Sequence, residues 1–358
     1  MADLRSSLSP RHYVDRDVFE HERHAILRSS WLPLCRADQI ASPGDVFADT
    51  LLDEPLVATR SVDGTIRVLS NVCPHRGSTV LADGPGRAST LVCPYHRWAY
   101  RLDGSFVGAP LADGADLDGV CLTAVRHTVW EGFVLVNLSG DAADPAGDLA
   151  GLSDRLAPWS WSELVTVGTR EFESTWNWKL MVENWIECYH HIGTHRETIE
   201  PIQPARTTEV IDSGGAPWAA MTVQTVEGLQ GGPNEWIPGV DPARARDLSV
   251  WAAFPLLLGG SVSRYAFWLK VAPLDAAHHR VTWYVLAHPS QLDRFGSSEV
   301  DAHMELICRI HVEDMETCAR VQAGLASGRL ERFRLAPLEV PIADFQRWVS
   351  ARLPAAAS

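Results

Sequence analysis

Two short stretches decide the fold prediction: CPHRG at residues 73–77 and CPYHRW at residues 93–98. Each holds one cysteine and one histidine, as C-x-H (Cys73, His75) and as C-x-x-H (Cys93, His96). Zinc commonly takes two cysteines and two histidines in a tetrahedral site. Zinc-finger spacing, however, pairs cysteine with cysteine and histidine with histidine. The sequence favours instead a site to which two loops each give one thiolate and one imidazole.

A [2Fe–2S] cluster of the Rieske type has this requirement, because one iron takes two thiolates and the other takes two imidazoles. The neutral imidazoles raise the reduction potential to roughly −150 to +300 mV. Pro74 and Pro94 stiffen the two turns, and Gly77 permits a close backbone approach. We therefore predict a Rieske cluster, with structural zinc as the alternative.

The surroundings of these loops predict a small antiparallel β domain. Runs such as PLVATRS and GFVLVNL are short and β-rich, and VDG (62–64) and LDG (102–104) mark turns between them. An Ala/Asp/Gly-rich stretch at 139–157 then suggests a boundary. We divide the chain into an N-terminal helical segment, the Rieske domain, a linker and a catalytic domain, at 1–40, 41–138, 139–157 and 158–358.

The second half of the chain mixes strands with helical patterns at 178–191, 298–326 and 341–352. It contains the stretch ENWIECYHHIGTH (183–195). On a helix Glu187 and His190 share a face. His195, five residues after His190, would point away from that face unless the helix ends or bulges near Gly193. Two histidines with one carboxylate form the facial triad of non-haem Fe(II), which leaves positions open for O₂.

With these motifs, the sequence resembles the α subunits of the Rieske non-haem iron oxygenases over nearly its whole length. The family's second cluster motif has glycine where this chain has Arg97. The resemblance implies an α+β fold, in which a small antiparallel β Rieske domain is joined to a helix-grip-type catalytic domain. In that second domain, helices pack on an antiparallel sheet.

The resemblance also implies a set of site residues. His190 and His195 match the iron-binding histidines, and Asp314 in HVEDMETCARVQAGL (311–325) matches the carboxylate ligand, with Glu313 as the alternative. Glu187 matches the acid that links the cluster histidine of one subunit to an iron ligand of the next. Asn184 is expected near the iron, where it would orient a ligand. We expect the adjacent His191 to be a partly exposed polar residue.

Glutamate at position 187, where most members have aspartate, resembles the branch that acts on amines and quaternary ammonium compounds. The expected activity is therefore O₂-dependent hydroxylation of a C–H bond next to nitrogen, which gives N-dealkylation or a hydroxylated product. Two alternatives stay open: hydroxylation or dioxygenation of an aromatic or natural-product substrate, and a Rieske electron carrier without oxygen chemistry. The implied cofactors are the [2Fe–2S] cluster and one Fe(II), with O₂ as co-substrate.

The net charge and the apolar stretches of the chain limit the kinds of partner that it is expected to bind. A formal charge of −14 argues against nucleic acid, and the longest apolar stretch, at 249–260, is too short to span a membrane. No secretory signal is evident at the N-terminus, so a cytoplasmic enzyme is expected. The resemblance implies a ferredoxin or flavin reductase as the donor of NAD(P)H electrons. It also implies a homotrimer, because a bridging acid between subunits requires a head-to-tail ring.

The sequence contains few features that indicate the substrate. Several aromatic residues of the second half, among them Tyr265, Phe267 and Trp283, could hold an alkylammonium, although core packing is the commoner role. Arg264 could meet a substrate carboxylate. The Gly/Pro-rich stretch at 227–248 predicts a long irregular loop, either a lid or a surface insertion.

Overall fold

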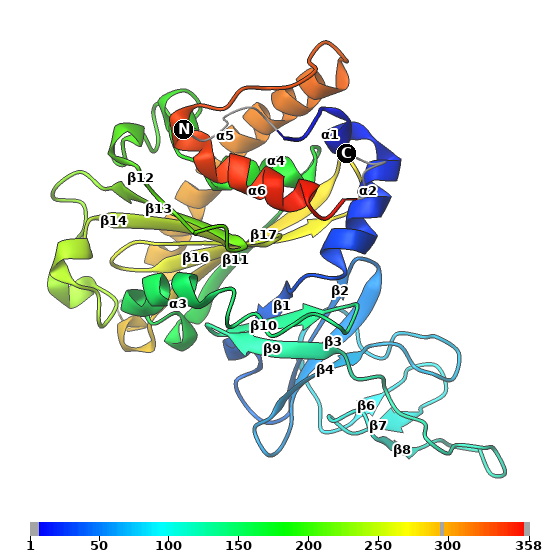
Figure 1. Ribbon diagram of the computed structural model, residues 1–358. Coiled ribbons are helices and arrows are strands. Elements are labelled where there is room, and N and C mark those ends of the chain that lie inside the picture. Colours follow the sequence, from blue (N-terminus) through cyan, green and yellow to red (C-terminus); the bar gives the residue numbers. More distant parts are fainter. Residues whose placement is uncertain (1–6, 294–296, 354–358) are drawn as a thin grey trace. The chain divides into compact units, whose positions relative to one another are not determined.

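A computed structural model describes residues 7–293 and 297–353. The chain forms two compact units (Figure 1). One contains Trp31–Ala143, and the other contains residues 1–30 together with Asp144–Ser358. The domain borders therefore differ from the expected ones, because residues 31–40 belong to the smaller unit. There the strand Leu32–Arg36 pairs with Phe133–Asn137.

The smaller unit is built from three antiparallel sheets, in the orders β1-β10-β9, β4-β3-β2-β5 and β6-β7-β8. Its core packs Val57, Leu69 and Tyr100 around Cys73 and Cys93. The two cysteines are therefore held by the hydrophobic core rather than by a surface turn. The strands are β1 (Leu32–Arg36), β2 (Asp45–Leu51), β3 (Glu54–Arg60), β4 (Ile66–Ser70), β5 (Gly84–Arg87), β6 (Leu91–Val92), β7 (Ala99–Tyr100), β8 (Phe106–Gly108), β9 (Arg126–Trp130) and β10 (Phe133–Asn137).

The larger unit contains one antiparallel sheet of seven strands, in the order β11-β17-β16-β15-β14-β13-β12. The strands are β11 (Val165–Ser174), β12 (Glu209–Ile211), β13 (Trp218–Gln224), β14 (Asp247–Ala253), β15 (Leu257–Ser261), β16 (Ala266–Pro273) and β17 (His279–Ala287). The helices are α1 (Arg11–Val14), α2 (Arg16–Glu22), α3 (Ala150–Leu156), α4 (Trp178–Trp185), α5 (Ser297–Ala326) and α6 (Val340–Ser350). Helices α4, α5 and α6 pack on the sheet, against β14 and β16, β11, and β13 respectively (Figure 1).

Helix α4 is shorter than the predicted helix 178–191. It begins at Asn177, whose side chain accepts a hydrogen bond from the Lys179 N–H and donates one to the Ala276 carbonyl. It ends at Trp185, and a separate 3₁₀ turn follows at Tyr189–Ile192. The reason is local: the Glu187 carboxylate accepts from the His190 N–H at 3.1 Å and so caps the next turn.

The N-terminal helices are held to α4 by a buried ion pair. Lys179 Nζ lies 2.7 Å from Glu22 Oε2, and both side chains have 0% exposure. The indole of Trp178 donates to the same carboxylate oxygen. Burial raises the pKa of Glu22 and lowers that of Lys179, because desolvation of each charge opposes their mutual attraction. The pair thus fixes where α2 lies on the helix that leads into the site.

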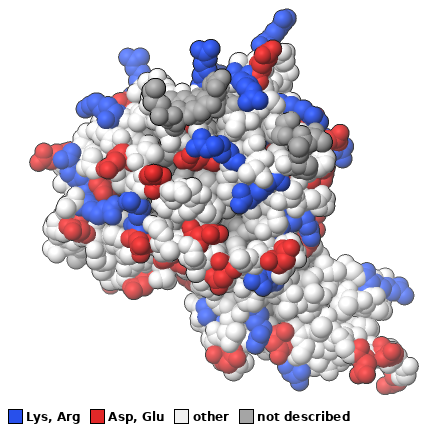
Figure 2. All heavy atoms as spheres, in the orientation of Figure 1, with Lys and Arg blue, Asp and Glu red and all other residues white. Residues whose placement is uncertain are grey.

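Surface charge agrees with the acidic composition. On the face shown in Figure 2, Lys and Arg side chains of the described residues alternate with Asp and Glu and form no continuous basic area. Among the described residues, no helix combines the length and the apolar character needed to cross a membrane.

Replacing Lys179 by Met should destabilise the protein by about 3–5 kcal/mol, because it leaves the carboxyl group of Glu22 buried without its cationic partner. The measurement is the urea midpoint followed by tryptophan fluorescence. The matched control is the double variant Glu22→Leu/Lys179→Met, which removes both charges and should recover most of the loss. A Lys179→Met midpoint equal to that of the wild type would contradict the argument.

Candidate metal centres

The two cysteine–histidine loops adopt the same turn. In the first, the Cys73 N–H donates to Ser78 O at 2.8 Å and the Gly77 N–H donates to Cys73 O at 2.9 Å. In the second, twenty positions later, the Cys93 N–H donates to Trp98 O at 2.8 Å and the Arg97 N–H donates to Cys93 O at 3.0 Å. The two turns therefore share their backbone hydrogen bonds, although the histidine is the second residue after Cys73 and the third after Cys93.

The four predicted cluster residues converge. Cys73 and Cys93 are 1% and 2% exposed, and the His75 and His96 rings lie with centroids 4.6 Å apart. Burial raises the pKa of Cys93, but the Tyr95 N–H and the Cys73 thiol outweigh it, so the pKa falls below its usual value. A thiolate is the form that binds iron.

The surroundings of one histidine nitrogen test whether these residues fit the expected cluster. His96 Nδ1 is buried and has no hydrogen-bond partner among the described residues. A buried ring nitrogen without a partner is costly unless it binds something outside the protein chain. The Tyr100 hydroxyl lies 3.2 Å from Cys73 Sγ, where it can donate to a thiolate. Two thiols, two imidazoles and an unsatisfied ring nitrogen fit a Rieske cluster.

The backbone conformation at Arg97 explains why the family's motif has glycine at this position. Its backbone φ is +61°, close to the +75° of Gly77 at the same position of the other turn. Side chains with a Cβ rarely adopt this left-handed conformation. The next residue, Trp98, stacks on His75 with ring planes 1° apart and centroids 4.5 Å apart. The strained turn therefore places a ring that orients one of the cluster histidines.

Replacing Arg97 by Gly should stabilise the smaller unit by about 1 kcal/mol, because it removes the cost of the left-handed backbone. The guanidinium has no ion-pair partner among the described residues, so little is lost with it. The measurement is the temperature at which the visible absorption of the cluster disappears. Gly77→Ala, which introduces the same strain into the other turn, should lower that temperature; a fall for both variants would contradict the explanation.

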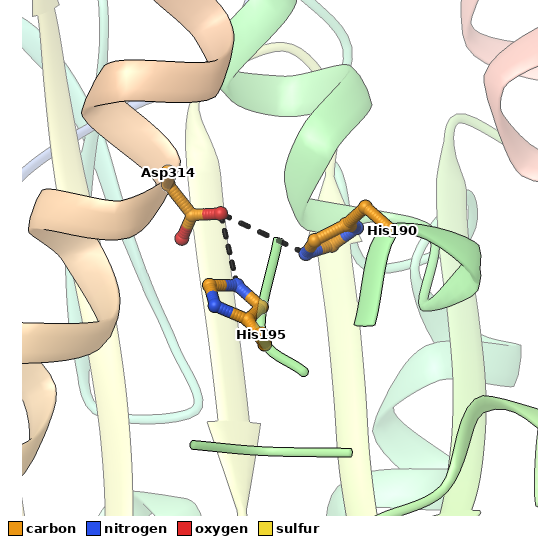
Figure 3. A group of neighbouring side chains, drawn as sticks. All are labelled: His190, His195 and Asp314. Carbon is orange, nitrogen blue, oxygen red and sulfur yellow. Dashed lines mark ion pairs between the residues drawn. The ribbon is translucent and has the colours of Figure 1, made fainter. Parts of the chain in front are cut away.

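The second predicted site is assembled from two parts of the larger unit (Figure 3). His190 and His195 come from the segment after α4, and Asp314 comes from α5. Asp314 Oδ1 lies 3.0 Å from His195 Nε2 and 3.7 Å from His190 Nε2. One ligand atom from each of the three residues lies within 4.8 Å of the others. The structure thus brings together the three residues expected to bind iron.

Carboxylates fix both imidazole rings. Glu187 Oε1 lies 2.5 Å from His190 Nδ1, and Glu313 Oε2 lies 2.8 Å from His195 Nδ1. A carboxylate accepts, so each Nδ1 carries the proton and each Nε2 presents a lone pair. Those two lone pairs and the Asp314 carboxylate would repel one another unless a cation lay between them. This donor set fits Fe(II).

Further contacts hold the carboxylates themselves. Asn184 Nδ2 donates to Asp314 Oδ1 at 3.2 Å, which places Asn184 beside the site as expected. Thr198 Oγ1 donates to Glu313 Oε2 at 2.6 Å. For His190, burial lowers the pKa but the charge and hydrogen bond of Glu187 outweigh it, so the pKa lies above its usual value.

His191 does not lie where we expected it. It is 4% exposed and faces a cavity, rather than being a partly exposed surface residue. The helix on which the expectation depended ends before this position. His191 Nδ1 lies 3.2 Å from the Gln203 carbonyl oxygen, and the ring centroid is 5.0 Å from that of His190. Burial first, then His190, lowers the pKa of His191 to about 3, so the ring is neutral.

The cavity beside the triad has a volume of about 140 Å³. Its walls are mostly apolar. Residues whose side chains line it away from the triad include Trp185, Ile199, Ile202, Leu248, Val250, Val262, Tyr265, Phe267, Trp283, Leu306, Ile307 and Ile310. No lysine or arginine is among the described residues that line it. Phe267 reaches the wall because its cross-strand partner is Gly260, where a Cβ would lie 2.6 Å from the Phe267 ring.

The lining bears on the residues that were considered for substrate binding. Arg264 does not line the cavity; its guanidinium pairs with Glu235 at 3.1 Å and with Glu299 at 2.5 Å. Trp251 and Trp268 are fully buried core residues. The long loop between β13 and β14 is held by a hydrogen bond from the Ile237 N–H to the Ser263 carbonyl. None of its described residues lines the cavity, and Leu248, which does, lies on β14.

A second hollow reaches the same histidine from another side. This groove, of about 480 Å³, is lined by Glu187 and His190 together with Glu183, Glu339 and Phe333. Burial raises the pKa of Glu183 to about 7, and the Tyr13 hydroxyl donates to it at 2.6 Å. Asn184, Glu187 and His190 line both the groove and the cavity.

Sequence reasoning missed three functional residues. Glu313 was considered only as a substitute ligand, yet it hydrogen bonds to a ligand. Trp185 and Gln203 were not singled out, and both line the cavity. Only the adjacent acids Glu313 and Asp314 in HVED gave a sequence signal for these roles. A second carboxylate next to a metal ligand on one helix can hydrogen bond to a ligand imidazole.

Taken together, a paired cysteine–histidine site and a separate two-histidine, one-carboxylate site define the class of Rieske-type, non-haem iron proteins. Residues 161–355 match the ring hydroxylating alpha subunit (catalytic domain) family, and residues 30–123 match the Rieske [2Fe–2S] domain family. The first match covers more than half of the chain, which therefore belongs to the ring-hydroxylating alpha subunit family. The predicted family and the predicted α+β fold class are confirmed.

Curated relatives share part of the chain. The glycine betaine monooxygenase oxygenase subunit of Chromohalobacter salexigens is 34% identical over 198 residues, which are 55% of this chain and 44% of the relative. The carnitine monooxygenase oxygenase subunit of Escherichia coli K12 is 31% identical, over 56% of this chain and 55% of the relative. The chain thus spans about half the length of these relatives.

Two comparisons extend over nearly the whole chain. The chloroplastic choline monooxygenase of Arabidopsis thaliana is 26% identical over 354 residues, which are 93% of this chain and 79% of the relative. A crystal structure of a quaternary ammonium Rieske monooxygenase in complex with L-carnitine has a TM-score of 0.83 at 24% identity, covering 98% of this chain and 96% of that one. The second comparison shows that the fold is shared.

Proposed function

We propose that this chain is the oxygenase component of a Rieske non-haem iron monooxygenase that hydroxylates a C–H bond next to nitrogen. The observation that carries the proposal is the convergence of His190, His195 and Asp314 on one point at the wall of an apolar cavity. An electron carrier has no need of such a triad or of a cavity beside it.

The residues that would hold the metals are those the geometry brings together. Cys73, His75, Cys93 and His96 would bind the [2Fe–2S] cluster. His190, His195 and Asp314 would bind Fe(II). When bound, the cluster supplies electrons and the iron supplies the open positions at which O₂ is activated.

Each of the surrounding residues has a defined task. Glu187 and Glu313 keep the protons on the Nδ1 atoms of His190 and His195, so that each Nε2 remains available. Asn184 fixes Asp314 from one side. The aliphatic and aromatic walls hold the substrate and exclude water from the reacting carbon.

The overall reaction for an N-methyl substrate is balanced by two external electrons. R₂N–CH₃, O₂, two electrons and two protons give R₂N–CH₂OH and water. The carbinolamine then breaks its C–N bond to give R₂NH and formaldehyde. The electrons would come from NAD(P)H through a ferredoxin or flavin reductase.

The groove lined by Glu187 and His190 is a suitable binding place for the group that donates electrons to the iron. We propose that the cluster domain of a second copy lies there, which closes a head-to-tail homotrimer. Glu187 would then join a cluster histidine of that copy to His190. Two buried or half-buried acids beside it, Glu183 and Glu339, border the groove.

A second candidate function is the hydroxylation of a small arene. The observation that favours it is the aromatic part of the cavity wall, in which Trp185, Phe267 and Trp283 are mutual neighbours. The product separates the two candidates, since only N-dealkylation releases formaldehyde.

Purified protein should contain one iron beyond the two of its cluster. Asp314→Ala should lose that one iron while keeping its sulfide and its Rieske-type EPR signal, because the cluster lies on other residues. Glu313→Gln should weaken iron binding about 10–100-fold, since it removes the partner of His195 Nδ1.

The matched control is Glu316→Gln on the same helix, whose side chain is 70% exposed and which should bind iron normally. Zinc without sulfide in the wild type, or equal iron in wild type and Asp314→Ala, would contradict the proposed ligand sets.

With a reductase and NAD(P)H, a small N-methylamine should give one formaldehyde for each O₂ consumed. Glu187→Gln should bind iron more weakly, as Glu313→Gln does, and after reloading with saturating Fe(II) it should have a reducible cluster but turn over at least tenfold more slowly, because the electron path loses its bridging carboxylate. The measurements are oxygen uptake, formaldehyde and single-turnover cluster oxidation. Unchanged turnover in Glu187→Gln would remove this residue from the electron path.

A further inference from the structure

The cavity lining carries information about which nitrogen compound fits. Resting on the proposed function, we infer that the substrate is a small secondary or tertiary amine that carries an N–H when protonated and that lacks a carboxylate. The structure assigns His191 Nε2 as the acceptor of that N–H. Quaternary ammonium compounds have no N–H, so this inference separates the chain from such substrates.

The first observation is the orientation of His191. Its Nδ1 lies 3.2 Å from a backbone carbonyl oxygen, which can only accept, so Nδ1 carries the proton. Nε2 therefore presents a lone pair, and no hydrogen bond to Nε2 is made by the described residues. The ring lines the cavity, with its centroid 5.0 Å from that of His190 and 5.7 Å from that of His195. An amine bound there holds its N-methyl carbons beside the triad.

The second observation is the charge of the walls. The charged groups lining the cavity are Glu187 and Asp314, both acids, and no described lining residue is lysine or arginine. Arg264, the residue considered from the sequence for a substrate carboxylate, is paired with two glutamates and lies outside the lining. A substrate carboxylate would therefore be desolvated without a protein cation to pair with it.

The third observation is the arrangement of the aromatic rings. The centroid of Trp185 lies 5.4 Å from that of Trp283 and 5.9 Å from that of Phe267, and the last two lie 6.0 Å apart. Trp185 lies at 87° to Phe267 and at 72° to Trp283, whereas the last two rings are 33° apart, so the three rings form a corner rather than a closed cage. Such a corner attracts a cation without fixing its rotation, so the orientation of the amine depends on the hydrogen bond to His191.

The fourth observation is size. The cavity of about 140 Å³ is close to the roughly 150 Å³ of an apolar cavity known to bind benzene. A substrate of six to eight heavy atoms, about that of N,N-dimethylbutylamine, suits this space. That amine is protonated at neutral pH and has one N–H.

Three matched probes test the inference. N,N-dimethylbutylamine is the reference, butyltrimethylammonium replaces its N–H by a methyl group, and 4-(dimethylamino)butanoate adds a carboxylate. Binding to the iron-loaded protein is measured anaerobically by titration calorimetry, and formaldehyde release is measured separately with reductase. The wild type should bind the reference amine at least tenfold more tightly than either of the other two probes.

Two variants assign the effect to His191. His191→Leu removes the acceptor and should weaken binding of the reference amine about tenfold while leaving butyltrimethylammonium unchanged, so that the preference disappears. His191→Gln keeps an acceptor and should keep the preference. Iron and sulfide contents equal to those of the wild type show that both variants are folded.

The outcomes are distinct. Equal or tighter binding of butyltrimethylammonium or of the carboxylate by the wild type overturns the inference, as does a preference that survives in His191→Leu, since size alone then causes it. The predicted binding order without formaldehyde from any probe supports the assignment of His191 and contradicts N-dealkylation. Formaldehyde from all three probes at similar kcat/KM supports the proposed function and overturns the inference.

Discussion

The chemistry of the larger unit depends on two short hydrogen bonds between carboxylates and imidazoles. Glu187 and Glu313 each accept the Nδ1 proton of one histidine, and this decides the tautomer of both rings. Without them, either Nε2 could carry the proton and the three donors would not converge on a cation. The capped start of α4 and the buried pair of Lys179 and Glu22 matter because they set where this segment lies.

The cluster loops show how far a local motif can be interpreted. Cys73, His75, Cys93 and His96 could be predicted from the sequence, because each of two short loops holds one cysteine and one histidine. The stacking of Trp98 on His75 could not, since it depends on the left-handed backbone at Arg97. A glycine at that position would have indicated a left-handed backbone, whereas an arginine does not.

The triad was harder to derive. His190 and His195 stand out in the sequence, but Asp314 was reached only through a resemblance, because nothing in an ED pair on a helix says which carboxylate points inward. His191 was misplaced because the helix was extended six residues beyond its end at Trp185. That end is caused by a side chain, Glu187, capping the next turn, and helix propensity does not record such a contact. The cavity lining depends on cross-strand neighbours such as Gly260 and Phe267, which lie on separate strands and whose pairing is a property of the folded sheet.

Asn184, Glu187 and His190 line both the cavity and the groove. If the cluster domain of a second copy occupies the groove, as proposed, substrate and electron donor reach His190 from separate hollows. A compound seated in the groove would interrupt electron delivery without touching the substrate. Its inhibition would lower kcat and leave KM unchanged, and no excess of substrate would relieve it. The groove is thus a second candidate site for inhibitors, separate from the cavity beside the triad.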